Sequence, residues 1–131
     1  GAYSKRAGSW NLEAVYQLFP ILREKRGVPA TSLSGGQQQM VAIGRALMSN
    51  PKLLICDEIS LGLAPIVMKD IYQALDRVTG AGLTAIIVEQ DVGLAQQVSS
   101  RLYCFQEGRV SLAARSSEAT REQISAAYFG I

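Results

Sequence analysis

Hydrophobic residues recur at helical spacing in the first part of the chain. Between positions 11 and 26 they repeat every three or four residues, as one face of a helix requires: Leu12, Val15, Tyr16, Phe19 and Leu22. Pro20 lies inside this pattern and has no backbone N–H to donate, so we expect the helix to kink or split there. A basic end, which suits a helix C-terminus, precedes Gly27, where the helix is expected to stop.

Two largely apolar runs, at residues 53–56 and 83–88, have no helical period, and acidic residues close each of them. Such runs are typical of strands that are buried on both faces, as in a parallel sheet. Between them, Pro65 is suited to the first turn of a helix that continues to about position 78. Strand, helix and strand at this spacing predict a right-handed βαβ unit.

The other predicted elements complete an α/β chain with a small antiparallel appendage. They are helices over 34–49, 91–99 and 117–128 and a β-hairpin with strands at 102–105 and 109–112. Ser34 is a good N-cap for the first of these helices, and Asn50-Pro51 ends it. Glu107-Gly108 is suited to the turn of the hairpin. No interdomain linker is visible, and 131 residues are enough for one domain of ordinary size.

Composition excludes several classes of protein. Apolar residues make up 48% of the chain and charged residues 18%, so intrinsic disorder is not expected. The net charge is +2 and no aromatic residues alternate with basic ones, which argues against nucleic acid as a partner. The mean hydropathy is +0.12, so either the core is large for the length or some apolar surface is meant for a partner.

Missing residue types and segments narrow the chemistry. The chain has no histidine, which excludes a Ser-His-Asp triad and a histidine general base. Cys56 and Cys104 lie in apolar stretches, which favours a reduced, cytosolic compartment. No apolar run approaches the ~20 residues that span a bilayer. The first residues do not resemble a signal peptide.

Residues 33–37 (LSGGQ), here called the signature segment, open a predicted helix. Gly35 and Gly36 let another molecule approach the backbone, and first-turn N–H groups at the positive end of a helix suit a phosphate. Ser34 and Gln37 complete the set of candidate binding residues. An ordinary helix cap with a glycine turn explains the segment equally well when it is taken alone.

A second set of candidates follows the two predicted strands. Asp57 and Glu58 end the first strand, at the edge where ligands bind in open α/β sheets. One of these carboxylates can hold Mg²⁺ while the other polarises a water molecule. Gln90 follows the second strand and can hydrogen-bond a terminal phosphate or the attacking water, although an amide cannot act as a base. An acidic turn and a plain strand-to-helix connection at 60–64 are the alternative interpretations.

The order of these pieces resembles the back half of an ABC-type ATPase domain. LSGGQ at 33–37 is that family's signature motif, and residues 53–57 resemble its Walker B strand. By resemblance Asp57 binds the metal, Glu58 is the catalytic glutamate, 60–64 is the D-loop, and Gln90 takes the place of the switch histidine. The stretches 44–48 (GRALM), 60–65 (SLGLAP) and 88–90 (VEQ) are similar to ATP-binding subunits of branched-chain amino acid importers.

The chain also departs from the family pattern. No G-x-x-x-x-G-K-[ST] sequence occurs in the 131 residues, and Ile59 stands where proline normally follows the catalytic glutamate. The resemblance therefore implies a partial P-loop NTPase core that corresponds to the C-terminal portion of a cassette. Its parts would be a loose segment (1–10), the end of a helical subdomain with the signature helix (11–50), and a segment with Walker B, D-loop, switch region and C-terminal elements (51–131).

The resemblance implies cofactors, partners and a location. The cofactors are ATP and Mg²⁺, the partners are a second ABC ATPase subunit and a membrane permease, and the place is the cytoplasmic face of the membrane. Because two such domains pair head to tail, Ser34, Gly35 and Gly36 would contact nucleotide held by the partner. We expect the isolated chain to lack ATPase activity and to associate with itself through exposed strand edges. The alternative function is a non-catalytic module that pairs with itself or with intact ABC ATPase subunits.

Overall fold

The computed structural model describes residues 6–130, and the chain divides into two compact units. The first ends at Ile86 and the second begins at Ile87. In chain order the first unit contains α1 (Leu12–Leu18), α2 (Pro20–Glu24), the 3₁₀ helix η2 (Ala30–Ser32), α3 (Gly35–Leu47), β1 (Leu53–Asp57) and α4 (Pro65–Gly80). Strand β2 (Thr84–Val88) crosses the division between the units.

The predicted interruption at Pro20 is confirmed. Helix α1 ends at Leu18, and Pro20 is the first residue of α2, where its missing N–H costs nothing. Both helices contact α3. Gly44 of α3 lies directly against Val15 of α1, since a Cβ atom on Gly44 would come within 2.6 Å of Val15 Cγ1. The two helices therefore approach more closely than any side chain at position 44 would allow.

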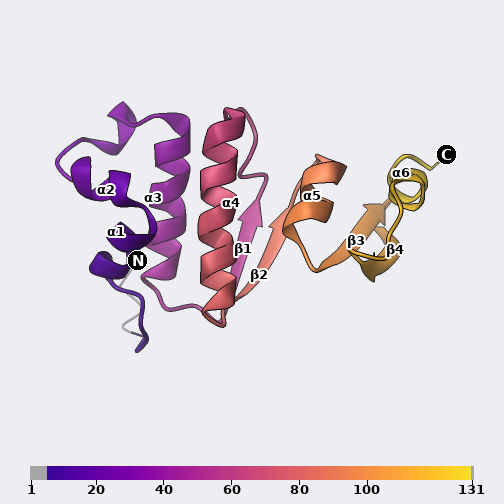
Figure 1. Ribbon diagram of the computed structural model, residues 1–131, viewed down its shortest axis with the longest axis horizontal. Coiled ribbons are helices and arrows are strands. Elements are labelled where there is room, and N and C mark those ends of the chain that lie inside the picture. The colour runs from indigo at the N-terminus through magenta and orange to yellow at the C-terminus, as the bar shows by residue number, and fades with distance from the viewer. Residues whose placement is uncertain (1–5, 131) are drawn as a thin grey trace. The chain divides into compact units, whose positions relative to one another are not determined.

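Strands β1 and β2 form a two-stranded sheet, with α4 as the connection between them. Both arrows point the same way in Figure 1, as the predicted βαβ unit requires. Helix α4 contacts α3, and the largest fully buried side chains of this unit come from these two helices: Leu47, Ile71 and Val78. Arg77 Nη2 also donates to the carbonyl oxygen of Leu18 at 3.0 Å, which ties α4 to the end of α1.

The expectation that both strands are buried on both faces is wrong. Burial alternates along β1: Leu54 and Cys56 are buried, but Leu53 and Ile55 are 44% and 63% exposed. Ile86 and Val88 of β2 are also exposed. Apolar side chains on both sides of a strand predict two covered faces only if a second layer is present. Among the described residues, nothing covers the side that carries Ile55.

The second unit contains α5 (Val92–Val98), β3 (Arg101–Gln106), β4 (Arg109–Arg115) and α6 (Arg121–Phe129). Strands β3 and β4 form the predicted antiparallel hairpin, with an irregularity between Cys104 and Phe105. Its turn is Glu107-Gly108, and both residues have the positive φ that a tight hairpin turn requires. A small core joins the hairpin to the helices through Leu102, Cys104, Ala119 and Ile124.

The last helix begins later than expected. We predicted a helix from position 117, but α6 starts at Arg121, and residues 117–120 are turn and loop. Thr120 is the N-cap: its hydroxyl accepts from Gln123 N at 3.1 Å, and Gln123 Oε1 accepts from Thr120 N at 2.9 Å. This reciprocal capping box fixes the first residue of the helix.

No helix in the described part of the chain is long and apolar enough to span a bilayer. The two cysteines, Cys56 and Cys104, are buried free thiols. Burial raises the pKa of each thiol, so both stay protonated at neutral pH and neither behaves as a nucleophile.

Candidate functional site

The signature segment forms the N-terminus of α3, with Ser34 as its N-cap. Gln37 N donates to Ser34 Oγ and Ser34 N donates to Gln37 Oε1, each at 3.2 Å. The side chains of Ser34 and Gln37 therefore satisfy each other's backbone. The first-turn N–H groups of Gly35 and Gly36 have no acceptor within the helix, as at any helix start. Ser34 and Gly35 are exposed, whereas Gly36 is buried.

The two glycines of the signature segment lie against two different residues near the start of α4. A Cβ atom on Gly36 would overlap Val67 Cγ1, in the first turn of α4. A Cβ atom on Gly35 would be in ordinary contact with Leu63 Cδ2 at 3.6 Å. The start of α3 therefore packs on the segment that follows Asp57 and Glu58. The sequence pattern explains glycine at position 36 by the approach of a ligand, and the structure adds a second explanation, the close packing against Val67.

Asp57 is the last residue of β1, and its exposed side chain lies on the same face as Leu53 and Ile55. Glu58 follows with φ of +49°, a left-handed conformation that is uncommon for a glutamate. Its carbonyl oxygen accepts from Leu61 N at 3.2 Å, which closes a turn directly after the strand. The chain thus reverses at Glu58, and Glu58 is half-buried where Asp57 is exposed.

Ile59 anchors this turn. Its side chain is 6% exposed and belongs to the hydrophobic core. An apolar anchor one residue after Glu58 holds the start of the 60–64 connection without the rigid ring that proline would supply. Further along, Gly62 has φ of +74°, and Leu61 is 69% exposed. The sequence signalled neither the burial of Ile59 nor the exposure of Leu61, because both depend on which way the turn faces.

The donor set around Asp57 suits a magnesium ion only in part. Carboxylate oxygen is a ligand that Mg²⁺ prefers, but the described residues contain no group of three or more acidic, histidine or cysteine side chains that could hold a metal. A magnesium ion at Asp57 would therefore be completed by water and by phosphate oxygens, which is how nucleotide-bound magnesium is usually held. Asp57 fits such a role as one ligand among several.

Gln90 belongs to the second unit, between the end of β2 and the start of α5. Its side chain is exposed. The next residue, Asp91, is the N-cap of α5 and accepts from Leu94 N at 2.9 Å. The structure thus groups Ser34, Gly35, Gly36, Gln37, Asp57 and Glu58 in the first unit. Gln90 lies in the other unit.

Comparison with known proteins finds relatives among the ATP-binding proteins of transporters. The family model described as ABC transporter matches residues 5–60. The high-affinity branched-chain amino acid transport ATP-binding protein BraG of Pseudomonas aeruginosa is 46% identical over 99 residues, which are 76% of this chain and 42% of BraG. The arginine transport ATP-binding protein ArtM of Bacillus subtilis is 37% identical over 107 residues, which are 82% of this chain and 44% of ArtM.

The fold is similar to that of solved cassettes. The structure of the ADP conformation of MJ1267, an ATP-binding cassette of an ABC transporter, superimposes with a TM-score of 0.69 and 28% identity. The alignment covers 92% of this chain and 47% of that one. The chain therefore spans less than half the length of the curated relatives it matches.

The α/β fold, the capped signature segment and the acidic strand end together define part of an ATP-binding cassette. Within that class, the matches in sequence and in structure show that the chain belongs to the ABC transporter family.

Proposed function

We propose that this chain is part of the ATP-binding, ATP-hydrolysing subunit of an ABC importer for branched-chain amino acids. The observation that carries the proposal is the packing of the signature segment on the residues after Asp57 and Glu58, within one unit. This arrangement holds together the two parts that a cassette uses on nucleotide. The substrate class rests on the 46% identity to BraG, which exceeds the 37% identity to the arginine transport protein ArtM.

The proposed mechanism gives each candidate residue its own task. Asp57 binds Mg²⁺ through water, because its carboxylate is exposed at the strand end. Glu58 polarises the attacking water, since the sharp turn directs it differently from Asp57. Gln90 hydrogen-bonds the terminal phosphate. When bound, ATP and Mg²⁺ supply the phosphoryl group and the positive charge that offsets its oxygens.

In this mechanism the signature segment acts on a partner's nucleotide. The N–H groups of Gly35 and Gly36, at the positive end of α3, stabilise phosphate charge presented by a second cassette. Ser34 is exposed and adds a hydroxyl at the same place. The whole assembly would be two ATP-binding subunits docked on a membrane permease at the cytoplasmic face of the membrane.

A second candidate function is a non-catalytic module that pairs with itself or with intact ABC ATPase subunits. One observation favours it: no G-x-x-x-x-G-K-[ST] sequence occurs in the 131 residues, so nothing recognisable cradles the phosphates of a nucleotide at Asp57 and Glu58. Both functions predict that the 131-residue chain alone does not turn over ATP.

Calorimetric titration of MgATP into the purified chain, with an ATPase assay on the same sample, tests whether the chain alone binds and hydrolyses nucleotide. We expect neither binding nor turnover. Micromolar binding, or turnover that disappears in Glu58→Gln, would show that the chain builds its own phosphate site and would contradict the proposal.

A further inference from the structure

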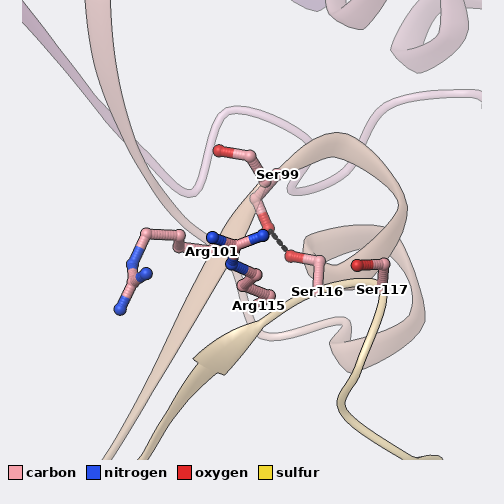
Figure 2. A pocket seen from close by; sticks show the side chains of 6 residues that line it. Ser99, Arg101, Arg115, Ser116 and Ser117 are labelled. Atoms are coloured by element: carbon pink, nitrogen blue, oxygen red, sulfur yellow. Dashed lines mark hydrogen bonds between the residues drawn. The ribbon is translucent and has the colours of Figure 1, made fainter.

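The second unit contains a pocket that the proposed nucleotide chemistry does not use. It lies where β3 begins and β4 ends, has a volume of about 450 Å³, and is lined by Ser99, Ser100, Arg101, Arg115, Ser116 and Ser117 (Figure 2). That volume is within the range of about 300–1,000 Å³ found for small-molecule sites. The lining carries two positive charges and four hydroxyl groups and no carboxylate.

The two arginines of the pocket are direct cross-strand neighbours. Arg101 pairs with Arg115 in the register of the hairpin, so both side chains leave the same face of the sheet. Like charges placed directly opposite each other destabilise an antiparallel pair. Within residues 6–130, neither guanidinium forms an ion pair with a carboxylate. An anion between the two arginines would remove this repulsion.

Arg101 is also held in place. Its Nε donates to Tyr103 Oη at 3.3 Å, and its Cζ lies 5.8 Å from the centroid of the Tyr103 ring. Tyr103 follows two positions later on the same strand and therefore lies on the same face. These contacts use one of the donors of the guanidinium and leave its two Nη groups for a ligand.

Hydrogen bonds fix the floor of the pocket. Ser99 Oγ donates to Ala95 O at 2.6 Å, so in its 3.0 Å contact with Ser116 Oγ it accepts (Figure 2). Ser116 N donates to Ser100 O at 3.0 Å. Gln96 Nε2 donates to Ser116 O at 3.0 Å. Ser99 and Ser116 are thus engaged with each other, whereas the exposed hydroxyls of Ser100 and Ser117 face solvent.

We propose that this pocket binds a phosphate-bearing anion between Arg101 and Arg115, with the hydroxyls of Ser100 and Ser117 as further donors. Guanidinium groups bind phosphate through charge-assisted, often paired hydrogen bonds, and hydroxyls complete such sites. The volume leaves room for a substituent on the phosphate. Free phosphate esters and phospholipid headgroups share this chemistry. All the residues involved lie in the second unit, so the site does not depend on the proposed role of Asp57, Glu58 or the signature segment.

Titration of the ¹⁵N-labelled 131-residue chain with inorganic phosphate tests the site. We expect saturable amide shifts at Ser100, Arg101, Ser116 and Ser117, and a melting temperature that rises with phosphate. Arg101→Gln and Arg115→Gln should each weaken binding at least tenfold and abolish the rise. Both variants should still fold, because each removes one of two repelling charges. Arg109→Gln is the matched control: Arg109 is an exposed arginine of the same hairpin, paired with Gln106 at its other end.

Equal weakening in Arg109→Gln, or a rise in melting temperature that persists in both pocket variants, would overturn the site, since either result reflects general charge screening. A titration with phosphate that produces no saturable shifts would also overturn the site, with one exception. The exception is a chain that sediments with phosphatidylglycerol vesicles but not with phosphatidylcholine vesicles, and that does so only when both arginines are present. That result would support the site and identify a lipid headgroup as the source of the phosphate. Phosphate binding without sedimentation would support a free phosphate ester.

Discussion

Gly36 of the signature segment lies so close to Val67 of α4 that there is no room for a Cβ atom between them. A single glycine therefore has two tasks. It presents a backbone N–H at the start of α3. It also lets α4, the helix that follows Asp57 and Glu58 along the chain, pack against that start. Packing and proposed function are joined at this one contact.

The first prediction concerns this contact. Gly36→Ala should lower the free energy of unfolding by about 1–3 kcal/mol, because the methyl group overpacks a closed interface. Val67→Ala in the same chain should recover part of that loss by removing the overlapping atom. Urea unfolding of both variants measures the effect.

Gly80→Ala is the matched control for Gly36→Ala. A Cβ atom on Gly80 meets nothing within 4 Å, and Gly80 is the last residue of α4. Its replacement should be neutral or stabilising by up to about 1 kcal/mol, since alanine favours a helix. A Gly36→Ala chain as stable as Gly80→Ala would contradict the packing argument.

The second prediction concerns Asn50, which joins two distant parts of the first unit. Its Oδ1 accepts from Trp10 N at 2.8 Å, and its Nδ2 donates to Trp10 O at 3.1 Å and to Arg6 O at 3.2 Å. Its φ is +48°, which asparagine and glycine tolerate. Asn50→Gly keeps the backbone conformation and removes these bonds.

We therefore expect the Trp10 amide to exchange with solvent much faster in Asn50→Gly, with a loss of about 1–3 kcal/mol of stability because two partly buried hydrogen bonds to Trp10 and one exposed bond to Arg6 are removed. Asn50→Ala should cost more, since alanine also resists the left-handed backbone. Trp10 is the single tryptophan, so its fluorescence reports the same change. Unchanged exchange at Trp10 would show that other contacts hold residues 6–10.

The third prediction concerns pH and the start of α6. The pKa of the Glu122 carboxyl is lowered from 4.5 because it accepts hydrogen bonds from its own backbone N–H and from the Thr120 hydroxyl. A lowered pKa in the folded chain means that its contribution to stability is complete above about pH 4.5 and is lost as pH falls through the folded value. Acid should therefore loosen the first turn of α6.

Thr120→Ala isolates this effect. It removes the capping hydroxyl, so the pKa of Glu122 should rise toward 4.5, and the helix should lose about 1 kcal/mol of stability. A titration of the Glu122 carboxyl by NMR in both chains measures the shift. Glu118→Gln is a suitable control for the loss of a polar side chain near the start of α6, because Glu118 precedes the helix and takes no part in its cap. An unchanged pKa of Glu122 in Thr120→Ala would show that the Thr120 hydroxyl does not lower it.

Local chemistry explains which features were predictable from the sequence. Pro20 splits α1 from α2, and Glu107-Gly108 turns the hairpin, because each depends on the backbone preferences of one or two residues. The predicted start of α6 at position 117 is too early, because the capping box of Thr120 and Gln123 sets Arg121 as the first residue of the helix.

Tertiary contacts explain the rest. The exposure of Ile55 depends on whether a second layer covers the sheet, which the apolar pattern of its strand does not report. The need for glycine at position 36 arises from Val67, thirty-one residues further along the chain. The positive φ of Glu58 and the burial of Ile59 both belong to the turn after β1, and the direction of that turn is not visible in the sequence alone.

The central claim is that the signature segment completes the nucleotide site of a partner cassette. The most direct measurement is the ATPase rate of an intact partner such as BraG with and without this chain, compared for Ser34→Arg and Glu58→Gln. Ser34 is exposed at the start of α3, so arginine there should block the partner's phosphates without disturbing the core. The account predicts that Ser34→Arg abolishes any stimulation and that Glu58→Gln leaves stimulation at the partner's site largely intact. The reverse pattern would contradict it.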